Sequence, residues 1–357
     1  MIEANDHVQK NYINNFPNIY KSDKKLYVHH QGSETIGNNN WKKIFNEYID
    51  IFKKYDKIIF DNGWEATNIN IITKIINLLE ENNLKDVLYV DGGLDNYFKK
   101  NKVVYAHKFI IPYNDDNYIK LKDRSILYIS LARLIDTKFQ RLFFTYELYK
   151  NNLLSDGIVT CGSSLEEIDR NHKGLDLFPE DFQKLIPLCY DGVVSRRDSS
   201  VPYLQFGEEC LINVVQESSF EIIRSKKYPS MYFGDLYWSS RPFFTEKTAK
   251  AFNSGQIPLF VTVNGYVNIL KIMGFDVFDD IVDHSYDTEI DTDKRILMVV
   301  DELLRLKEIG LENLKNIYGL EERFLYNRNH LGVVYTQMSI RYRQIINSWF
   351  FEKNIKL

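Results

Sequence analysis

Short apolar runs alternating with amphipathic segments constrain the fold of this 357-residue chain more than any other feature. Such alternation, with strands and helices of ordinary length, predicts βαβ units and mostly parallel sheets, so the predicted fold class is α/β. In the first third of the chain, strands are expected at 26–30, 57–60, 87–90 and 103–111, and helices at about 41–54 and 67–79. A second series is expected with strands at 125–131, at Cys161 and at 210–215, and with helices at about 138–151, 266–273, 296–310 and 335–353.

The length of the chain favours two domains, because a single hydrophobic core rarely grows so large. Residues 112–117 form a turn-rich break between the two series of strands. We therefore expect an N-terminal α/β domain over 1–118, a C-terminal α/β domain over 119–334, and a helix over 335–357 that packs back toward the N-terminal domain. Two Rossmann-like domains of this kind would face each other across a cleft.

The composition is that of a soluble globular protein, with 44% hydrophobic and 26% charged residues. We find no apolar run near the roughly 20 residues of a membrane helix and no signal-peptide pattern, so we expect a cytoplasmic protein, or one of the host cytoplasm if the source is viral. The three cysteines, Cys161, Cys189 and Cys210, are odd in number, far apart and in no Cys-x-x-Cys pair, which argues against a disulfide framework and against a zinc site. The net charge of -4 gives no overall attraction to nucleic acid.

Residues 241–265 carry the clearest chemical signal, a short helix followed by a buried strand. Thr245 is suited to cap the helix, and Glu246 places a carboxylate at the positive end of the helix dipole. Ser254-Gly255 ends the helix, and an apolar run follows Pro258. Glu246 and Lys247 together suit an anionic ligand that also bears hydroxyl groups.

Ligands of open parallel sheets gather at the carboxyl ends of the strands. The segments that meet this description are 61–65 and 91–93 in the N-terminal domain, and 132–141 and 216–219 with 245–247 in the C-terminal domain. This division suits an acceptor bound by the first domain and an anionic donor bound by the second.

Three segments of the second half, 214–219, 243–248 and 254–259, resemble the donor-binding region of the α1,3-fucosyltransferases. Those enzymes carry Phe-Glu-Asn-Ser, where this chain has Gln-Glu-Ser-Ser, then Thr-Glu-Lys and a Gly-x-x-Pro strand. The chain is also similar to glycosyltransferase-like proteins of large phages and viruses, in which a strand ending near an arginine (Arg133) precedes a helix with a second arginine (Arg141). The resemblance covers about residues 125–287.

This resemblance implies a glycosyltransferase of the two-domain GT-B architecture, with a UDP- or GDP-linked sugar as donor. We expect the reaction to be metal-independent and to need no cofactor besides the donor, because the one Asp-x-Asp pattern of the chain is better interpreted as a helix cap. The resemblance also implies that Glu246 binds the ribose hydroxyls and that Lys247 contacts the diphosphate. Glu217 ends the preceding strand, so we expect it to approach the sugar or the ribose. Thr245 belongs to the same donor-binding turn, and phosphate binding is expected of Arg133 and Arg141. The chemistry is consistent, because a carboxylate accepts hydrogen bonds from a diol and an ammonium offsets the charge of a leaving phosphate.

The general base should come from the N-terminal domain, with Glu65 and Asp61 as first candidates and Asp91 as the next. Asp61 and Asp91 also precede glycine-containing turns, which offers a purely structural explanation. Asp291-Thr292-Asp293 matches the Asp-x-Asp pattern of metal-dependent glycosyltransferases, but helix capping is the better interpretation because no apolar strand precedes it.

Two other functions stay open. A phage-type enzyme that glycosylates hydroxymethylated DNA bases, in place of an acceptor carbohydrate, would need a basic groove on the N-terminal domain. Its lysines would be Lys53, Lys54, Lys99, Lys100, Lys102 and Lys108. A catalytically silent module that only binds a nucleotide sugar is the second alternative.

Overall fold

The computed structural model describes residues 25–29, 49–50, 52–62, 69–84, 86–92, 103–105, 120–132, 135, 138–162, 174–188, 209–217, 220–221, 223–233 and 241–351. The chain forms two compact units, each a mixture of helices and parallel strands, and the α/β class is confirmed. The first unit comprises residues 1–108, 237–243 and 337–357, and the second comprises 109–236 and 244–336. The domain boundary expected at 118/119 lies outside the described residues.

The first unit contains a four-stranded parallel sheet. Its strands are β1 (Lys25–His29), β2 (Lys57–Asn62), β3 (Val87–Asp91) and β4 (Val103–Tyr105), in the order β1-β2-β3-β4. Helix α4 (Ile69–Glu81) connects β2 to β3 and ends two residues later than predicted. Most of the helix expected at 41–54, and the last six residues of the strand expected at 103–111, lie outside the described residues.

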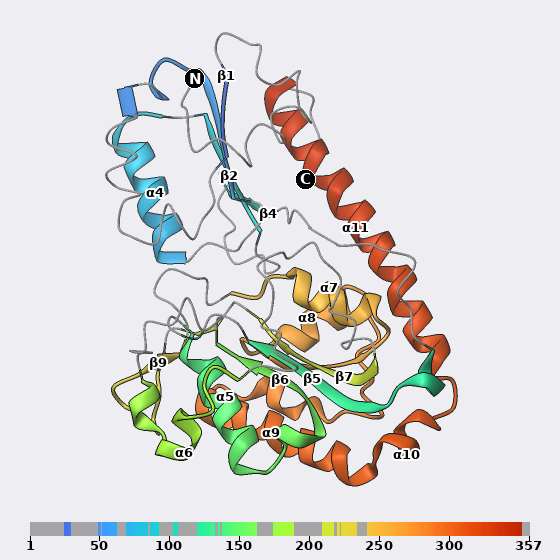
Figure 1. Cartoon of the computed structure of the whole chain (residues 1–357). Coiled ribbons are helices and arrows are strands. Elements are labelled where there is room, and N and C mark those ends of the chain that lie inside the picture. The colour runs from blue at the N-terminus through green and yellow to red at the C-terminus, as the bar shows by residue number, and fades with distance from the viewer. Residues whose placement is uncertain are drawn as a thin grey trace. The chain divides into compact units, whose positions relative to one another are not determined.

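The two faces of this sheet are covered by different helices (Figure 1). Side chains alternate between the faces of a strand, so Ile58 and Phe60 pack with α4, whereas Ile59 packs with the last turns of helix α11 (Leu320–Phe351). Tyr342 and Ile346 are among the α11 residues that cover this second face. This helix therefore completes the core of the first unit.

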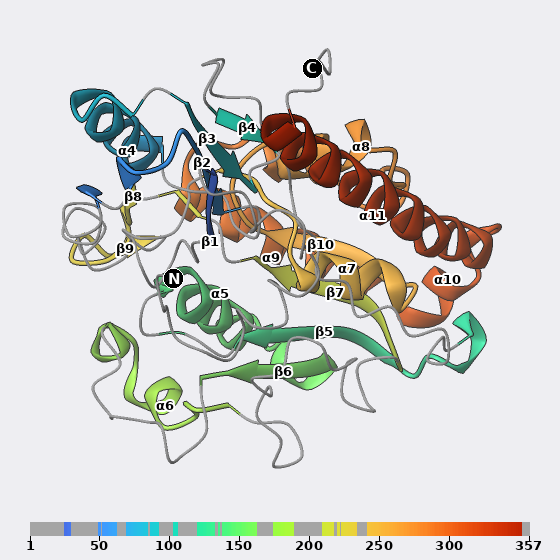
Figure 2. The same ribbon diagram turned by 90° about the horizontal axis from the view of Figure 1, so that it is seen from above.

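The second unit contains another four-stranded parallel sheet. Its strands are β5 (Ile126–Ala132), β6 (Gly157–Cys161), β7 (Cys210–Gln216) and β10 (Ile257–Val261). They lie in the order β10-β7-β5-β6 (Figure 2). The chain steps from β5 to β6 on one side and then returns to β7 on the other. The carboxyl ends of β5 and β7 therefore form a topological switch point, the place where open α/β sheets bind their ligands.

Helices cover both faces of the second sheet, as the continuous burial of β7 requires. Helices α5 (Phe139–Lys150) and α9 (Thr292–Ile309) pack together on one face, and α7 (Glu246–Asn253) packs on the other (Figure 1). The remaining helices of this unit that the structure describes are α6 (Glu180–Gln183), α8 (Tyr266–Ile272) and α10 (Leu311–Lys315). The short strands β8 (Ile223–Arg224) and β9 (Tyr232–Phe233) form an antiparallel pair.

The predictions for the second unit are confirmed within a few residues for β5, β7, α5, α8 and α9. The last helix is the main error, because α11 begins at Leu320 rather than at 335. Buried residues recur at helical spacing through the missed part, at positions 320, 324, 327, 328, 331 and 334. Asn327 and Arg328 interrupt the apolar character of this face, which hides its periodicity in the sequence.

Candidate functional site

The candidate site lies at the carboxyl edge of the second sheet, where β7 ends and α7 begins. Glu217 directly follows β7, and its backbone N–H donates to the Val261 carbonyl at 3.2 Å, which continues the pairing with β10. The hydroxyls of Thr245 and Thr248 both donate to the Glu217 carboxylate at 2.6 Å. These two bonds fix the start of α7 to the end of β7.

The first turn of α7 is built as the sequence predicts. Thr245 is the N-cap, and its Oγ1 accepts a hydrogen bond from the Lys247 backbone N–H at 3.2 Å, so the predicted cap is confirmed. Thr245 and Thr248 are three positions apart and share a helix face, which is directed to Glu217. The intervening Glu246 and Lys247 keep 28% and 27% of their side chains exposed. The turn thus has an anchored face and a half-exposed charged face.

Glu217 is completely buried, and both of its carboxylate oxygens have partners. Oε1 accepts from Thr248 and lies 3.5 Å from the Tyr266 hydroxyl oxygen, while Oε2 accepts from Thr245 and lies 3.8 Å from the Lys247 ammonium. A buried charge requires such partners. We therefore interpret Glu217 as the anchor of the turn, and its expected contact with a sugar or ribose is not carried into the proposal below.

Glu246 and Lys247 form an ion pair, with Lys247 Nζ 3.2 Å from Glu246 Oε1. Burial raises the pKa of Glu246, but the charges of Lys247 and Lys250 and the hydrogen bonds to its carboxylate outweigh this effect and hold the pKa below its usual range. Glu246 is therefore an ionised acceptor at neutral pH, beside an ammonium. A diol and a phosphate are the ligand groups that such a pair would hold together.

The helix starts near this edge differ in how they are capped. At α8, the backbone N–H groups of Val267 and Asn268 donate to the carboxylate of Asp287 at 3.0 and 3.1 Å, and at α9 the carboxylate of Asp291 is the cap. A capping carboxylate neutralises the positive end of a helix. The cap of α7 is the neutral Thr245, and the carboxylate in its first turn, Glu246, is paired with the ammonium of Lys247.

Arg141 lies at the switch point between β5 and β7. It occupies the first turn of α5, is 4% exposed, and donates from Nη2 to the backbone carbonyl of Gln216 at 3.3 Å. The side chain of Gln216 in turn donates to Ser130 of β5 at 2.9 Å. Lys138, the N-cap of α5, is a second buried cation at this end of the helix, which the sequence did not single out. Arg133 lies outside the described residues.

The structure describes two of the three candidate bases of the first unit, Asp91 and Asp61. Glu65 lies outside the described residues. Asp91 is the last residue of β3, opposite Asn62 of β2 and Tyr105 of β4. Asp61 is completely buried and accepts a hydrogen bond from the hydroxyl of Tyr342 on α11. We interpret Asp61 as a residue that holds α11 to the sheet and do not carry it forward as a base.

The capping interpretation of the Asp-x-Asp sequence is confirmed. The Asp291 carboxylate accepts from the Lys294 backbone N–H at 3.2 Å at the start of α9. Asp293 accepts from the Ser225 hydroxyl at 2.7 Å and from the Lys226 backbone N–H at 2.9 Å, and so holds the turn after β8. In the described part of the chain, no group of three His, Cys, Asp or Glu side chains is arranged to hold a metal ion.

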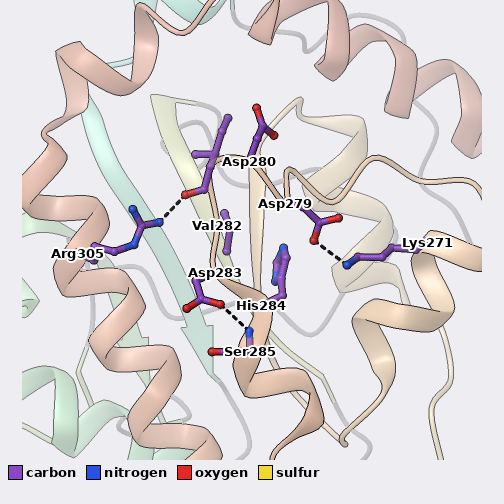
Figure 3. A pocket seen from close by; sticks show the side chains of 9 residues that line it. Lys271, Asp279, Asp280, Val282, Asp283, His284, Ser285 and Arg305 are labelled. Carbon is purple, nitrogen blue, oxygen red and sulfur yellow. Dashed lines mark hydrogen bonds and ion pairs between the residues drawn. The ribbon is translucent and has the colours of Figure 1, made fainter.

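A separate hollow of about 470 Å³ lies on the second unit (Figure 3). Its lining residues are Lys271, Asp279, Asp280, Ile281, Val282, Asp283, His284, Ser285 and Arg305. His284 is buried, with Nδ1 2.8 Å from the Tyr286 hydroxyl and Nε2 2.7 Å from the Val277 carbonyl, and burial lowers its pKa. Lys271 pairs with Asp279 at 2.7 Å. Both ring nitrogens of His284 have hydrogen-bond partners, and Lys271 and Asp279 form an ion pair with each other, so we assign the hollow no ligand.

Comparison of the chain with protein-family models gives no match, and comparison with curated proteins gives none either. We therefore base the functional assignment on the geometry at the start of α7.

Among the described residues, no helix has both the length and the apolar character to span a membrane. Cys161 and Cys210 are buried free thiols in β6 and β7, and Cys189 lies outside the described residues.

Proposed function

We propose that the chain is a glycosyltransferase whose second unit binds a nucleotide sugar at the first turn of α7. The observation that carries the proposal is the half-exposed Glu246–Lys247 pair, which the buried Glu217 anchors at the carboxyl edge of a parallel sheet. The presence of a parallel α/β sheet in each unit supports a GT-B architecture. The donor would be a UDP- or GDP-linked sugar.

In this proposal the donor is held by complementary charges. The Glu246 carboxylate accepts from the ribose hydroxyls, and the Lys247 ammonium contacts the diphosphate. Charge-assisted hydrogen bonds of this kind are about twice as strong as neutral ones. Arg141, at the switch point, is the proposed second phosphate contact, together with Arg133.

The transfer step needs a base and stabilisation of the leaving group. The acceptor hydroxyl oxygen would attack the anomeric carbon and lose its proton to a carboxylate, for which Glu65 and Asp91 remain the predicted candidates. The bond between the anomeric carbon and the phosphate oxygen breaks, and its electron pair leaves with the nucleoside diphosphate. Lys247 offsets the charge that develops there, which is the usual electrostatic contribution of a fixed cation.

The proposal is tested by the hydrolysis of nucleotide sugars in the absence of an acceptor. The full chain should release nucleoside diphosphate slowly from at least one UDP- or GDP-sugar, as measured by chromatography. Lys247→Met should lower this rate at least about tenfold, a loss of about 1.4 kcal/mol of transition-state stabilisation. Lys271→Met, with the same change of charge at a residue remote from this turn, should retain the wild-type rate.

Each outcome bears on a different function. Binding of a nucleoside diphosphate without any turnover would indicate the catalytically silent module. Absence of both binding and turnover contradicts the proposal altogether. Turnover that survives Lys247→Met unchanged contradicts the assigned site.

A further inference from the structure

We infer that Tyr266 is a positioning residue for the first turn of α7, acting through Thr248 and Glu217 on the orientation of Lys247. Tyr266 is the first residue of α8, eighteen positions after Thr248, and is completely buried. The effect of Tyr266 on ligand binding rests on the proposed function. Its effect on the first turn of α7 is a property of the free protein and can be measured without a ligand.

The hydrogen bonds of this cluster have a fixed direction. A hydroxyl group has a single hydrogen. Thr248 directs its hydrogen to Glu217 Oε1 at 2.6 Å, so in the 2.8 Å contact between the Tyr266 and Thr248 hydroxyls Tyr266 must be the donor. The donor chain thus runs from Tyr266 through Thr248 to the Glu217 carboxylate.

A second donor chain reaches the same carboxylate from Lys247. Thr245 directs its hydrogen to Glu217 Oε2 at 2.6 Å, and its oxygen accepts from the Lys247 backbone N–H at 3.2 Å and from Lys247 Nζ at 3.3 Å. The two chains meet at Glu217, one at each oxygen. A change at Tyr266 therefore reaches Lys247 through three hydrogen-bonded groups.

Tyr266 is itself held firmly. The two backbone N–H groups that follow it donate to Asp287, and its ring packs on Phe260 with the ring centroids 5.3 Å apart. Burial and the nearby charge of Glu217 raise the pKa of Tyr266 well above its ordinary value, so the phenol remains a donor at any physiological pH. Tyr266 thereby transmits the fixed position of α8 to the start of α7.

The first test measures the free protein. Tyr266→Phe removes only the hydroxyl, and amide hydrogen exchange of a peptide that covers Thr245–Lys250 should become about tenfold faster, because one bond of a buried network is lost. Tyr286→Phe is the matched control, since Tyr286 is also buried and its hydroxyl bonds to His284 and to the Phe260 backbone N–H rather than to α7. Equal exchange in wild type and Tyr266→Phe overturns the inference.

Substitutions at Thr248 supply a second measurement should the tyrosine variant fold poorly. Thr248→Val removes the relay hydroxyl and should accelerate the same exchange, whereas Thr248→Ser keeps the hydroxyl and should behave like the wild type. Similar exchange for the valine and serine variants overturns the inference as well.

The third test uses UDP and GDP as probes in a double-mutant cycle. If Tyr266 acts through Lys247, then Tyr266→Phe should weaken nucleotide binding about three- to tenfold in the wild type but not in Lys247→Met. Equal losses in both backgrounds indicate a merely structural tyrosine and overturn the inference. If neither nucleotide binds the wild type, the proposed function fails, and the exchange measurements still decide the role of Tyr266.

Discussion

Two glutamates of the same sheet edge differ in burial, and this difference assigns their roles. Glu217 is completely buried among hydroxyl donors, whereas Glu246 keeps 28% of its side chain exposed beside Lys247. A buried carboxylate that several donors satisfy holds structure, because rearranging it to contact a ligand would leave those donors unpaired. A partly exposed carboxylate beside a cation can exchange its partners for those of a ligand.

Substitution of these glutamates by glutamine should separate the two roles. Glu217→Gln should lower the free energy of unfolding by about 2–3 kcal/mol, since charge-assisted bonds are lost and an amide hydrogen faces buried hydroxyl donors. Glu246→Gln should cost less than about 1 kcal/mol, as expected for a half-exposed pair. Urea denaturation of both variants measures the difference, and equal losses would contradict the anchor role of Glu217.

Residues of the site were predictable where their interactions are local. Thr245 caps the turn that contains Lys247, two positions away, so the sequence alone predicts both the cap and the charged pair. The Thr-x-x-Thr spacing of Thr245 and Thr248 is a further local signal, because it places both hydroxyls on the helix face that meets Glu217. Tyr266 could not be predicted, because its contact with Thr248 exists only once α8 and α7 meet at the sheet edge.

Helix α9 shows how one acidic residue stabilises an element and makes it sensitive to pH. The hydrogen bond from the Lys226 ammonium, together with that from the Lys294 backbone N–H, holds the pKa of Asp291 below its usual range, although partial burial opposes the shift. A carboxyl group with a lowered pKa in the folded state stabilises that state above its unfolded-state pKa. This contribution is lost as the pH falls through the folded-state pKa.

Substitutions at Asp291 distinguish the cap from the charge. Asp291→Ala should lower the free energy of unfolding by about 1 kcal/mol at pH 7, because the cap of α9 is lost. Asp291→Asn keeps a capping oxygen and removes the charge, so its deficit relative to wild type should be largest near pH 6 and should shrink as the pH falls below about 4. A deficit that does not change between these pH values would contradict the assigned ion pair.

The secondary structure was predicted best where an element has one uniform environment. Strand β7 is buried along its whole length, and its unbroken apolar run identifies it directly. Helix α11 was predicted only in part, because its buried face changes from a mixed surface with Asn327 and Arg328 to the apolar residues Tyr342, Ile345 and Ile346. Its first half, up to Thr336, belongs to the second unit and its last half to the first, which explains this change.

The sequence predicts the α/β class and leaves the order of the strands open. The order β10-β7-β5-β6 depends on pairings between segments far apart in the chain, and the periodicity of each strand is the same in any order. The switch point, and with it the position of Arg141 beside Gln216, follows from this order alone. The division into two units likewise depends on tertiary contacts, since residues 237–243 and 337–357 join the first 108.

Titration calorimetry of the full chain with UDP and with GDP measures whether the start of α7 is a donor site. We predict that one of them binds with a Kd between about 1 μM and 1 mM, the range usual for enzyme substrates. Lys247→Met should weaken this binding at least about tenfold, which corresponds to about 1.4 kcal/mol, while Lys271→Met should bind like the wild type. Absence of binding for both nucleotides, or equal affinity of the Lys247→Met variant and the wild type, would contradict a donor site at the start of α7.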